Sequence, residues 1–90
     1  MIHQLKTWPK YFWAIQLGEK TFEIRINDRD FKPGDILQLC EFDPETQQYT
    51  GAQINRKVGY VLESTSEHNS IQGLKPGYII MSLLEKWSQY

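Results

Sequence analysis

Apolar residues recur along this chain with two different periods, which predicts one helix followed by several short strands. Trp8, Phe12 and Ile15 are spaced by four and three residues, as on one face of a helix over residues 9–17, and Pro9 suits its first turn. Gly18 stands where such a helix would end, because glycine tolerates the left-handed cap conformation. The remaining periodic stretches alternate with a period of two and predict strands.

The expected strands are separated by short turns that contain Pro, Gly, Asn or Asp. They cover residues 3–6, 21–26, 36–42, one or two strands within 49–62, and 78–84. The alternation of Val58, Tyr60 and Leu62 predicts that one face of that fourth region is buried. Phe31 is expected to anchor the preceding polar corner to the core. We expect a mobile loop over the polar residues 64–72 and a tail at 85–90.

Five or six short strands with one early helix predict an α+β, mainly β fold. The arrangement expected is a small closed or partly closed β-barrel with the helix packed at its side. Ninety residues predict one domain over residues 1–90, with a single modest core. Hydrophobic residues make up 40% of the chain, which indicates a globular protein, and no apolar stretch approaches the ~18 residues of a membrane span.

The first residues, the single cysteine and the two histidines indicate the expected compartment and the absence of a metal or cofactor. The first residues lack a basic leader followed by an apolar run, so we expect a cytoplasmic protein. Cys40 is the only cysteine and is expected to be reduced, in or near the core. His3 and His68 lie far apart and show no metal-ligand spacing, so neither a metal nor a cofactor is expected. His3 is interpreted as a strand residue with a local partner.

Residues 18–25, with the sequence GEKTFEIR, place two cations and two carboxylates at the junction between the helix and the second strand. In that half-buried strand Phe22, Ile24 and Ile26 point one way, while Glu23 and Arg25 point the other. Lys20 stands beside them at the start of the strand. One interpretation is a surface ion pair on a solvated strand face, worth only ~0–1 kcal/mol. The other is a small polar binding site.

This octet matches the GxKxxExR signature of ASCH domains, a branch of the PUA-like superfamily. Gly18, Lys20, Glu23 and Arg25 occupy its four fixed positions. The chain also resembles a small phage and bacterial group that is related to ASCH domains and described as RNA-binding. The matching segments cover nearly the whole chain and are residues 3–9 (HQLKTWP), 27–31 (NDRDF), 32–35 (KPGD) and 77–80 (GYII).

The resemblance implies a PUA-like barrel whose ligand cleft lies between the helix and the sheet. The residues expected around that cleft are Lys6, Trp8, Lys20, Glu23, Arg25 and Arg29. Lys20 and Arg25 would donate hydrogen bonds to phosphate or to base carbonyl oxygens. Glu23 would accept from an exocyclic amine of a base, or would orient Arg25. Trp8 or Tyr11 would stack a base, unless Trp8 belongs to the core.

The expected function is binding of RNA or a nucleotide, and the charge distribution limits its extent. The formal net charge is -1, and nucleic-acid-binding domains are usually basic overall. Residues 1–32 nevertheless carry six Lys and Arg against four Asp and Glu, whereas residues 33–90 carry four against seven. A basic face formed by the first third of the chain would suit a short RNA footprint rather than a long phosphate track.

Two other function classes remain open. Some ASCH-like proteins are amidohydrolases that act on acetylcytidine, with a lysine in the octet, a nucleophilic threonine three residues later and a separate glutamate. Here Glu23 stands at the threonine position, where a carboxylate is a poor nucleophile, whereas Lys20 is kept and Glu63 or Glu67 would be the distant acid. A ribonuclease would instead use Lys20 and Glu23 as acid and base. The second class is a phage-type module that binds a protein partner through exposed aromatic residues, namely Trp13, Trp87 and Tyr90.

Overall fold

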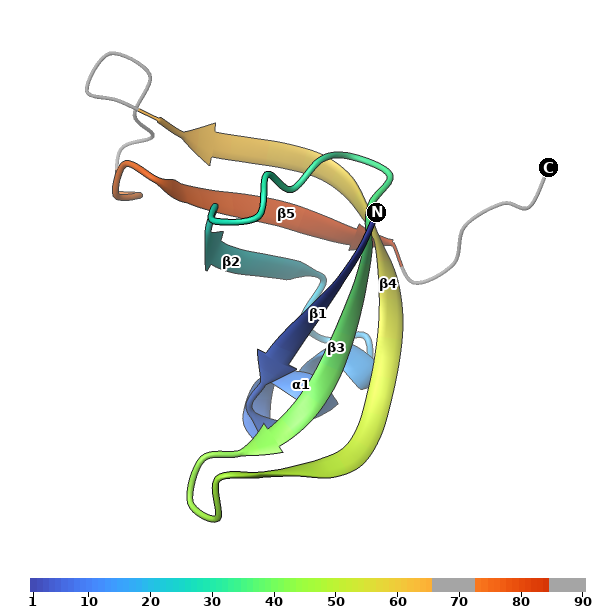
Figure 1. Ribbon diagram of the computed structural model, residues 1–90. Coiled ribbons are helices and arrows are strands. Elements are labelled where there is room, and N and C mark those ends of the chain that lie inside the picture. Colours follow the sequence, from blue (N-terminus) through green and yellow to red (C-terminus); the bar gives the residue numbers. More distant parts are fainter. Residues whose placement is uncertain (66–72, 85–90) are drawn as a thin grey trace, which may run out of the picture.

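The computed structural model describes residues 1–65 and 73–84, which form one curled sheet and one short helix (Figure 1). The elements are β1 (Ile2–Thr7), α1 (Pro9–Gln16), β2 (Phe22–Ile26), β3 (Ile36–Asp43), β4 (Gln48–Ser64) and β5 (Tyr78–Leu84). The strands are ordered β1-β3-β4-β5-β2, with β1 parallel to β3 and the other neighbours antiparallel. The structure is mainly β, as the sequence predicted, and its sheet forms half of a barrel.

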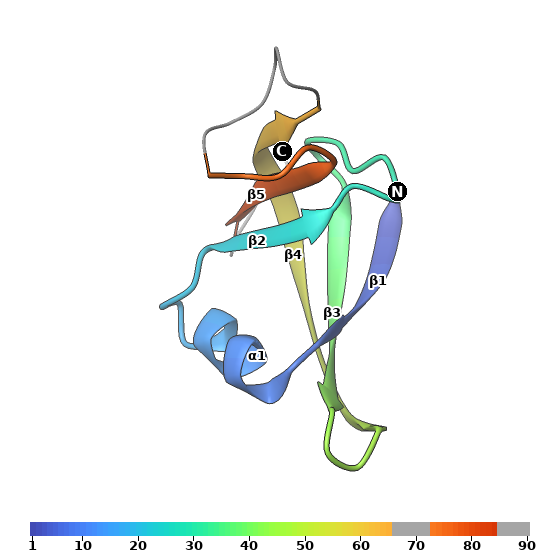
Figure 2. The ribbon, with the colours of Figure 1, turned by 90° about the vertical axis from the view of Figure 1, so that its left-hand side faces the viewer.

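The long strand β4 bends the sheet, because its first half pairs with β3 and its second half with β5 (Figures 1 and 2). The register against β5 shifts between Val58 and Val61, where the backbone comes close to Ser82. A Cβ built on Gly59 would lie 2.7 Å from the Ser82 hydroxyl oxygen, and the Tyr60 amide donates to that oxygen at 2.7 Å. Glycine therefore permits the close approach that this β-bulge requires.

The prediction that Val58, Tyr60 and Leu62 share a buried face of β4 is wrong, because the bulge begins after Val58. Val58 is buried, but Tyr60 is 71% exposed and Leu62 is 40% exposed, so the three do not share a buried face. An extra residue in one strand reverses the alternation beyond it, which a period of two cannot anticipate. The region 49–62, expected to hold one or two strands, is part of the single strand β4.

Helix α1 follows the predicted pattern closely. Pro9 is its first residue, Phe12 and Ile15 are each 2% exposed, and Gly18 adopts a positive φ of 79° just after its end. Ile15 belongs to the main core cluster. The helix lies on the concave side of the curled sheet (Figure 2). Buried members of that cluster are Leu5, Ile15, Phe31, Leu37, Leu39, Val58, Ile79, Met81 and Leu83. Phe31 is 4% exposed, so its predicted anchoring role is confirmed.

His3 has the local partner that the sequence predicted. Its Nε2 lies 2.8 Å from Asp35 Oδ2, and Asp35 also accepts from the Lys32 amide at 3.1 Å. Both side chains are largely buried. The Phe31 ring packs edge-on against the imidazole, with 4.7 Å between the two ring centres. The hydrogen bond to His3 is the main cause that lowers the pKa of Asp35; burial opposes it. The pair ties β1 to the turn before β3.

Strand β2 exposes its apolar residues and buries Glu23, the reverse of an ordinary half-buried strand. Its apolar residues Phe22, Ile24 and Ile26 are 43%, 49% and 53% exposed, whereas Glu23 is only 4% exposed. Glu23 and Arg25 pair across the sheet with Met81 and Ile79 of β5, whose side chains are fully buried. Because directly opposed residues project to the same face, the polar residues of β2 point into the concave side. The interpretation of a surface ion pair on a solvated face is therefore wrong for Glu23.

Several sequence expectations fall wholly or partly outside the described residues. The tail at 85–90 and most of the expected loop at 64–72 lie there, and so do Glu67, Trp87 and Tyr90. Ser64 is described and is fully buried at the end of β4, where its hydroxyl donates to the Leu74 carbonyl at 2.9 Å. Cys40 is a free cysteine and is partly buried in β3.

Candidate functional site

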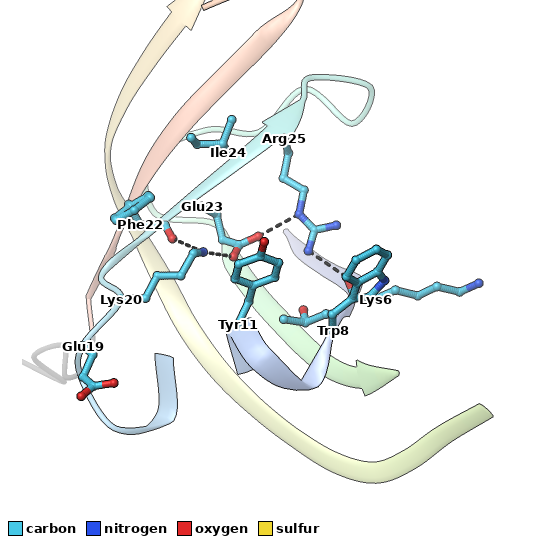
Figure 3. A pocket seen from close by; sticks show the side chains of 10 residues that line it. Lys6, Trp8, Tyr11, Glu19, Lys20, Phe22, Glu23, Ile24 and Arg25 are labelled. Carbon is cyan, nitrogen blue, oxygen red and sulfur yellow. Dashed lines mark hydrogen bonds and ion pairs between the residues drawn. The ribbon is translucent and has the colours of Figure 1, made fainter. Parts of the chain in front are cut away.

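A pocket of about 720 Å³ opens between α1 and β2 (Figure 3). The end of β1, the first turns of α1, the connection after the helix and the first four residues of β2 form its walls. Its lining residues are Lys6, Thr7, Trp8, Tyr11, Glu19, Lys20, Phe22, Glu23, Ile24 and Arg25. The octet and the end of β1, which α1 separates in sequence, thus meet at one opening.

A buried carboxylate between two cations forms the polar part of this pocket, and we call Lys20, Glu23 and Arg25 the triad. Lys20 Nζ donates to Glu23 Oε1 at 2.7 Å, and Arg25 Nε donates to Glu23 Oε2 at 2.8 Å. The Glu23 side chain is 5% exposed, against 18% for Lys20 and 26% for Arg25. The carboxylate is therefore held in one orientation by charge-assisted bonds, and the triad keeps a net charge of +1.

The local fold explains how Lys20 reaches this position. After Gly18 the chain turns so that the amides of Glu19 and Lys20 both donate to the Ala14 carbonyl, at 2.9 and 3.0 Å. Lys20 Nζ also donates to the Phe22 carbonyl at 2.6 Å, which folds the side chain back over the start of β2. A short helix cap thus fixes the first cation, while the β2–β5 register fixes the carboxylate and the second cation.

Aromatic side chains flank the triad. Trp8, the residue that precedes α1, is 55% exposed, and Tyr11, in the first turn of α1, is 43% exposed. Figure 3 shows their rings on the helix side of the opening, facing β2. Lys20 Nζ lies 5.6 Å from the centre of the Tyr11 ring and 5.0 Å from that of Phe22, within the range of cation–π attraction. The exposed ring of Trp8 contradicts the alternative that this residue is a core side chain.

Five of the six binding residues expected from the sequence line this pocket, and Arg29 is the exception. In Figure 3 the Lys6 side chain extends away from the triad, and its Nζ lies 4.4 Å from the centre of the Phe42 ring. Arg29 lies outside the pocket and donates through Nη1 to the Gln4 carbonyl at 2.6 Å. Arg29 therefore acts on the free edge of β1 rather than on the pocket.

Arg25 makes a similar contact with β1, so two arginines bridge the open side of the half-barrel. Arg25 Nη2 donates to the Lys6 carbonyl at 2.8 Å, next to the Arg29 bond to Gln4. Strands β1 and β2 are the two edges of the sheet, and their edge carbonyls need partners. The arginines supply charged donors to β1, and this links the triad to the strand that precedes α1.

Sequence reasoning missed Thr7, Glu19, Phe22 and Ile24 as lining residues. The alternation of His3, Leu5 and Thr7 could have indicated that Thr7, 3% exposed, faces the concave side. Glu63, weighed as a distant catalytic acid, accepts a hydrogen bond from Asn27 Nδ2 and does not line the pocket. Its place weakens the hydrolase alternative.

Within 1–65 and 73–84, no three or more His, Cys, Asp and Glu side chains cluster in a way that could hold a metal ion. No helix in the described part of the chain combines the length and the hydropathy that a membrane crossing requires.

Comparisons with known proteins identify the family. A search of curated proteins finds no match. The crystal structure of hypothetical protein PH0355 is similar, with a TM-score of 0.60 and 19% sequence identity over 93% of this chain and 98% of that one. At that identity the likeness shows a shared fold alone. A family model described as "Domain of unknown function (DUF3850)" matches residues 2–83. Because that match spans most of the sequence, the chain belongs to the DUF3850 family.

Proposed function

We propose that the pocket between α1 and β2 binds single-stranded RNA or a nucleotide without catalysing a reaction. The observation that carries this proposal is the buried triad, in which Glu23 fixes Lys20 and Arg25 at the floor of an aromatic pocket. A fixed pair of cationic donors beside exposed rings suits a ligand that has both hydrogen-bond acceptors and a flat apolar face. Nucleotides combine these two properties.

The aromatic side of the pocket supports stacking of one base. Trp8 and Tyr11 expose about half of their surface although they lie beside a small core, and both line the opening. Stacking on such rings is worth ~1–3 kcal/mol per base and does not depend strongly on sequence. The pocket holds one or two bases rather than a long strand, which agrees with the modest positive charge of the first third of the chain.

The resemblance of the octet to ASCH domains supports the same proposal from a different direction. We propose that the half-barrel is an ASCH-related member of the PUA-like superfamily, with Gly18, Lys20, Glu23 and Arg25 as its signature. In such a fold the ligand would enter between the helix and the sheet, which is where this pocket opens. The neighbour PH0355 is itself a hypothetical protein and adds no function.

Two exposed tryptophans, Trp8 just before α1 and Trp13 within it, provide a matched test. Trp8 is 55% exposed and lines the pocket, whereas Trp13 is 48% exposed and does not. Fluorescently labelled short single-stranded RNA would be titrated with wild type, Trp8→Ala and Trp13→Ala at two salt concentrations, with folding checked by circular dichroism. We expect Trp8→Ala to weaken binding by roughly 5- to 150-fold, the loss of one stacked base. Trp13→Ala should bind like wild type.

The salt dependence separates the expected contact from a non-specific one. Neutralisation of one or two phosphates predicts a shallow weakening of binding as salt rises, because each phosphate contact releases about one counterion. Equal loss in both tryptophan variants, or saturable binding that neither variant affects, would contradict the proposed pocket. Absence of binding in wild type would remove the RNA proposal itself.

A further inference from the structure

We infer that the floor of this pocket selects a ligand group that presents hydrogen-bond acceptors and no donor, so that guanine is preferred to adenine or a phosphate is bound. The inference rests on the proposed function, since it names the chemistry that the same pocket would read. It depends on which polar atoms of the triad are already engaged in the free protein.

Glu23 is committed to its two cationic neighbours. Each of its carboxylate oxygens accepts one charge-assisted bond, from Lys20 Nζ at 2.7 Å and from Arg25 Nε at 2.8 Å. The side chain is 5% exposed, so a ligand amine could reach it only by displacing a cation. Such an exchange would leave a buried charge without its partner, which is costly. The geometry therefore indicates that Glu23 orients the two cations and does not accept a hydrogen bond from a base amine.

The donors of the triad are only partly used. Lys20 has three N–H donors, and its bonds to the Phe22 carbonyl and to Glu23 use two of them. Arg25 uses Nε toward Glu23 and Nη2 toward Lys6, and no residue in the described part of the chain accepts from its Nη1. One ammonium hydrogen and the Nη1 amino group thus remain for a ligand. In Figure 3 the other lining carboxylate, Glu19, points away from the triad.

Bases differ in how well they match such a set of donors. Guanine offers O6 and N7 as two adjacent acceptors, and Arg or Lys pairing with this edge is the commonest specific contact to a base. Adenine places its N6 amino donor next to N7, so a donor-only floor would face an unmatched N–H. A phosphate also presents acceptors only, and it is the second source of the same chemistry.

Four ligands that share their scaffolds separate these sources: guanosine, adenosine, GMP and AMP, each titrated by calorimetry into the intact protein. If the floor reads the base, guanosine should bind at least about tenfold more tightly than adenosine. If it reads the phosphate, GMP and AMP should bind alike, and both nucleosides should bind at least about tenfold more weakly. Either result supports a donor-only floor.

A conservative variant tests the role of the guanidinium. Arg25→Lys keeps the positive charge but removes Nη1, the guanidinium group left for a ligand, so the preference for guanosine, or the gain from the phosphate, should shrink while adenosine binding stays constant. Glu19→Gln, at the rim of the same pocket, is the matched control and should leave both preferences unchanged. Circular dichroism would establish that each variant is folded.

The outcomes distinguish this inference from the proposed function. Adenosine binding as tightly as guanosine and as AMP would overturn the donor-only floor while leaving the pocket as a nucleoside site. If none of the four ligands and no short RNA binds, the proposed function fails and the inference fails with it. A guanosine preference that persists unchanged in Arg25→Lys would overturn the part assigned to Arg25, because Nη1 would then contribute nothing to the selection.

Discussion

Glu23→Gln should destabilise the fold strongly even though it only replaces one carboxylate oxygen with an amino group. The substitution keeps the shape and removes the charge that Lys20 and Arg25 both contact at 2.7–2.8 Å. A Gln side chain has one acceptor oxygen and one amino group, so the amino group must face one of the two cationic donors. At least one charge-assisted bond is lost, and both cations lose their counter-charge.

The magnitude follows from burial. Hydrogen bonds to charged groups contribute ~1.5–3 kcal/mol, and removing one partner of a fully buried ion pair costs ~3–5 kcal/mol. Lys20 and Arg25 keep 18% and 26% of their side-chain surface in water, which relieves part of that cost. We therefore expect a loss of about 2–4 kcal/mol in the free energy of unfolding. For a domain of this size that corresponds to a fall in Tm of roughly 10–30 °C.

Urea denaturation followed by far-ultraviolet circular dichroism at pH 7 measures this loss, with thermal denaturation as a second reading. Glu19→Gln is the control, because Glu19 is an exposed carboxylate of the same pocket and its loss should change stability by no more than about 0.5 kcal/mol. Glu23→Gln with the stability of wild type, or with no greater loss than Glu19→Gln, would refute the account of the triad as a buried structural centre.

Three further predictions concern other parts of the fold. Ile24→Thr on the exposed face of β2 should cost under about 1 kcal/mol, whereas Val58→Thr in the core should cost about 1–3 kcal/mol; equal costs in urea denaturation would contradict the orientation of β2. Arg29→Ala should speed amide hydrogen exchange in β1, because the charged donor to its edge is lost; unchanged exchange there would argue against an arginine bridge. The hydrogen bond to His3 lowers the folded-state pKa of Asp35, so the stability that the Asp35 carboxylate contributes should be complete above about pH 4 and lost as the pH falls further. Denaturation curves of Asp35→Asn should therefore show a smaller loss of unfolding free energy at acid pH than those of wild type. Equal losses in the two proteins would be inconsistent with this pair.

The sequence predicted most elements because their local signals agree with the tertiary structure. Pro9, the spacing of Phe12 and Ile15, and the glycine at position 18 indicated α1 almost to the residue. The last strand was predicted with the bounds that β5 has. In these segments one face is apolar and packs on the core, so periodicity and burial coincide.

The orientation of β2 could not be predicted from its own residues. Alternation shows that Phe22, Ile24 and Ile26 share a face, but it does not show which face of a curled sheet they occupy. Pairing with β5 and the position of α1 decide this, and both depend on long-range contacts. The bulge between Val58 and Val61 was missed for the same reason, since an extra residue leaves little trace in sequence.

The candidate site was anticipated in its residues more than in its arrangement. The octet motif indicated the triad, yet spacing alone made a surface ion pair an equally good interpretation of Glu23. Its burial depends on the concave side of the sheet, which the motif does not encode. Arg29 was expected at the cleft from its place in a matching segment, but its side chain reaches the Gln4 carbonyl at the edge of β1.

Nuclear magnetic resonance titration of the nitrogen-15-labelled protein with short single-stranded RNA tests the central claim most directly. The account predicts saturable shifts that concentrate on the Trp8 indole, the Lys20 amide and the Arg25 Nε–H, all at the pocket between α1 and β2. The Trp13 indole, outside the pocket, should shift little. Shifts confined to the convex face of β4 and β5, or no shifts at saturating RNA, would contradict it.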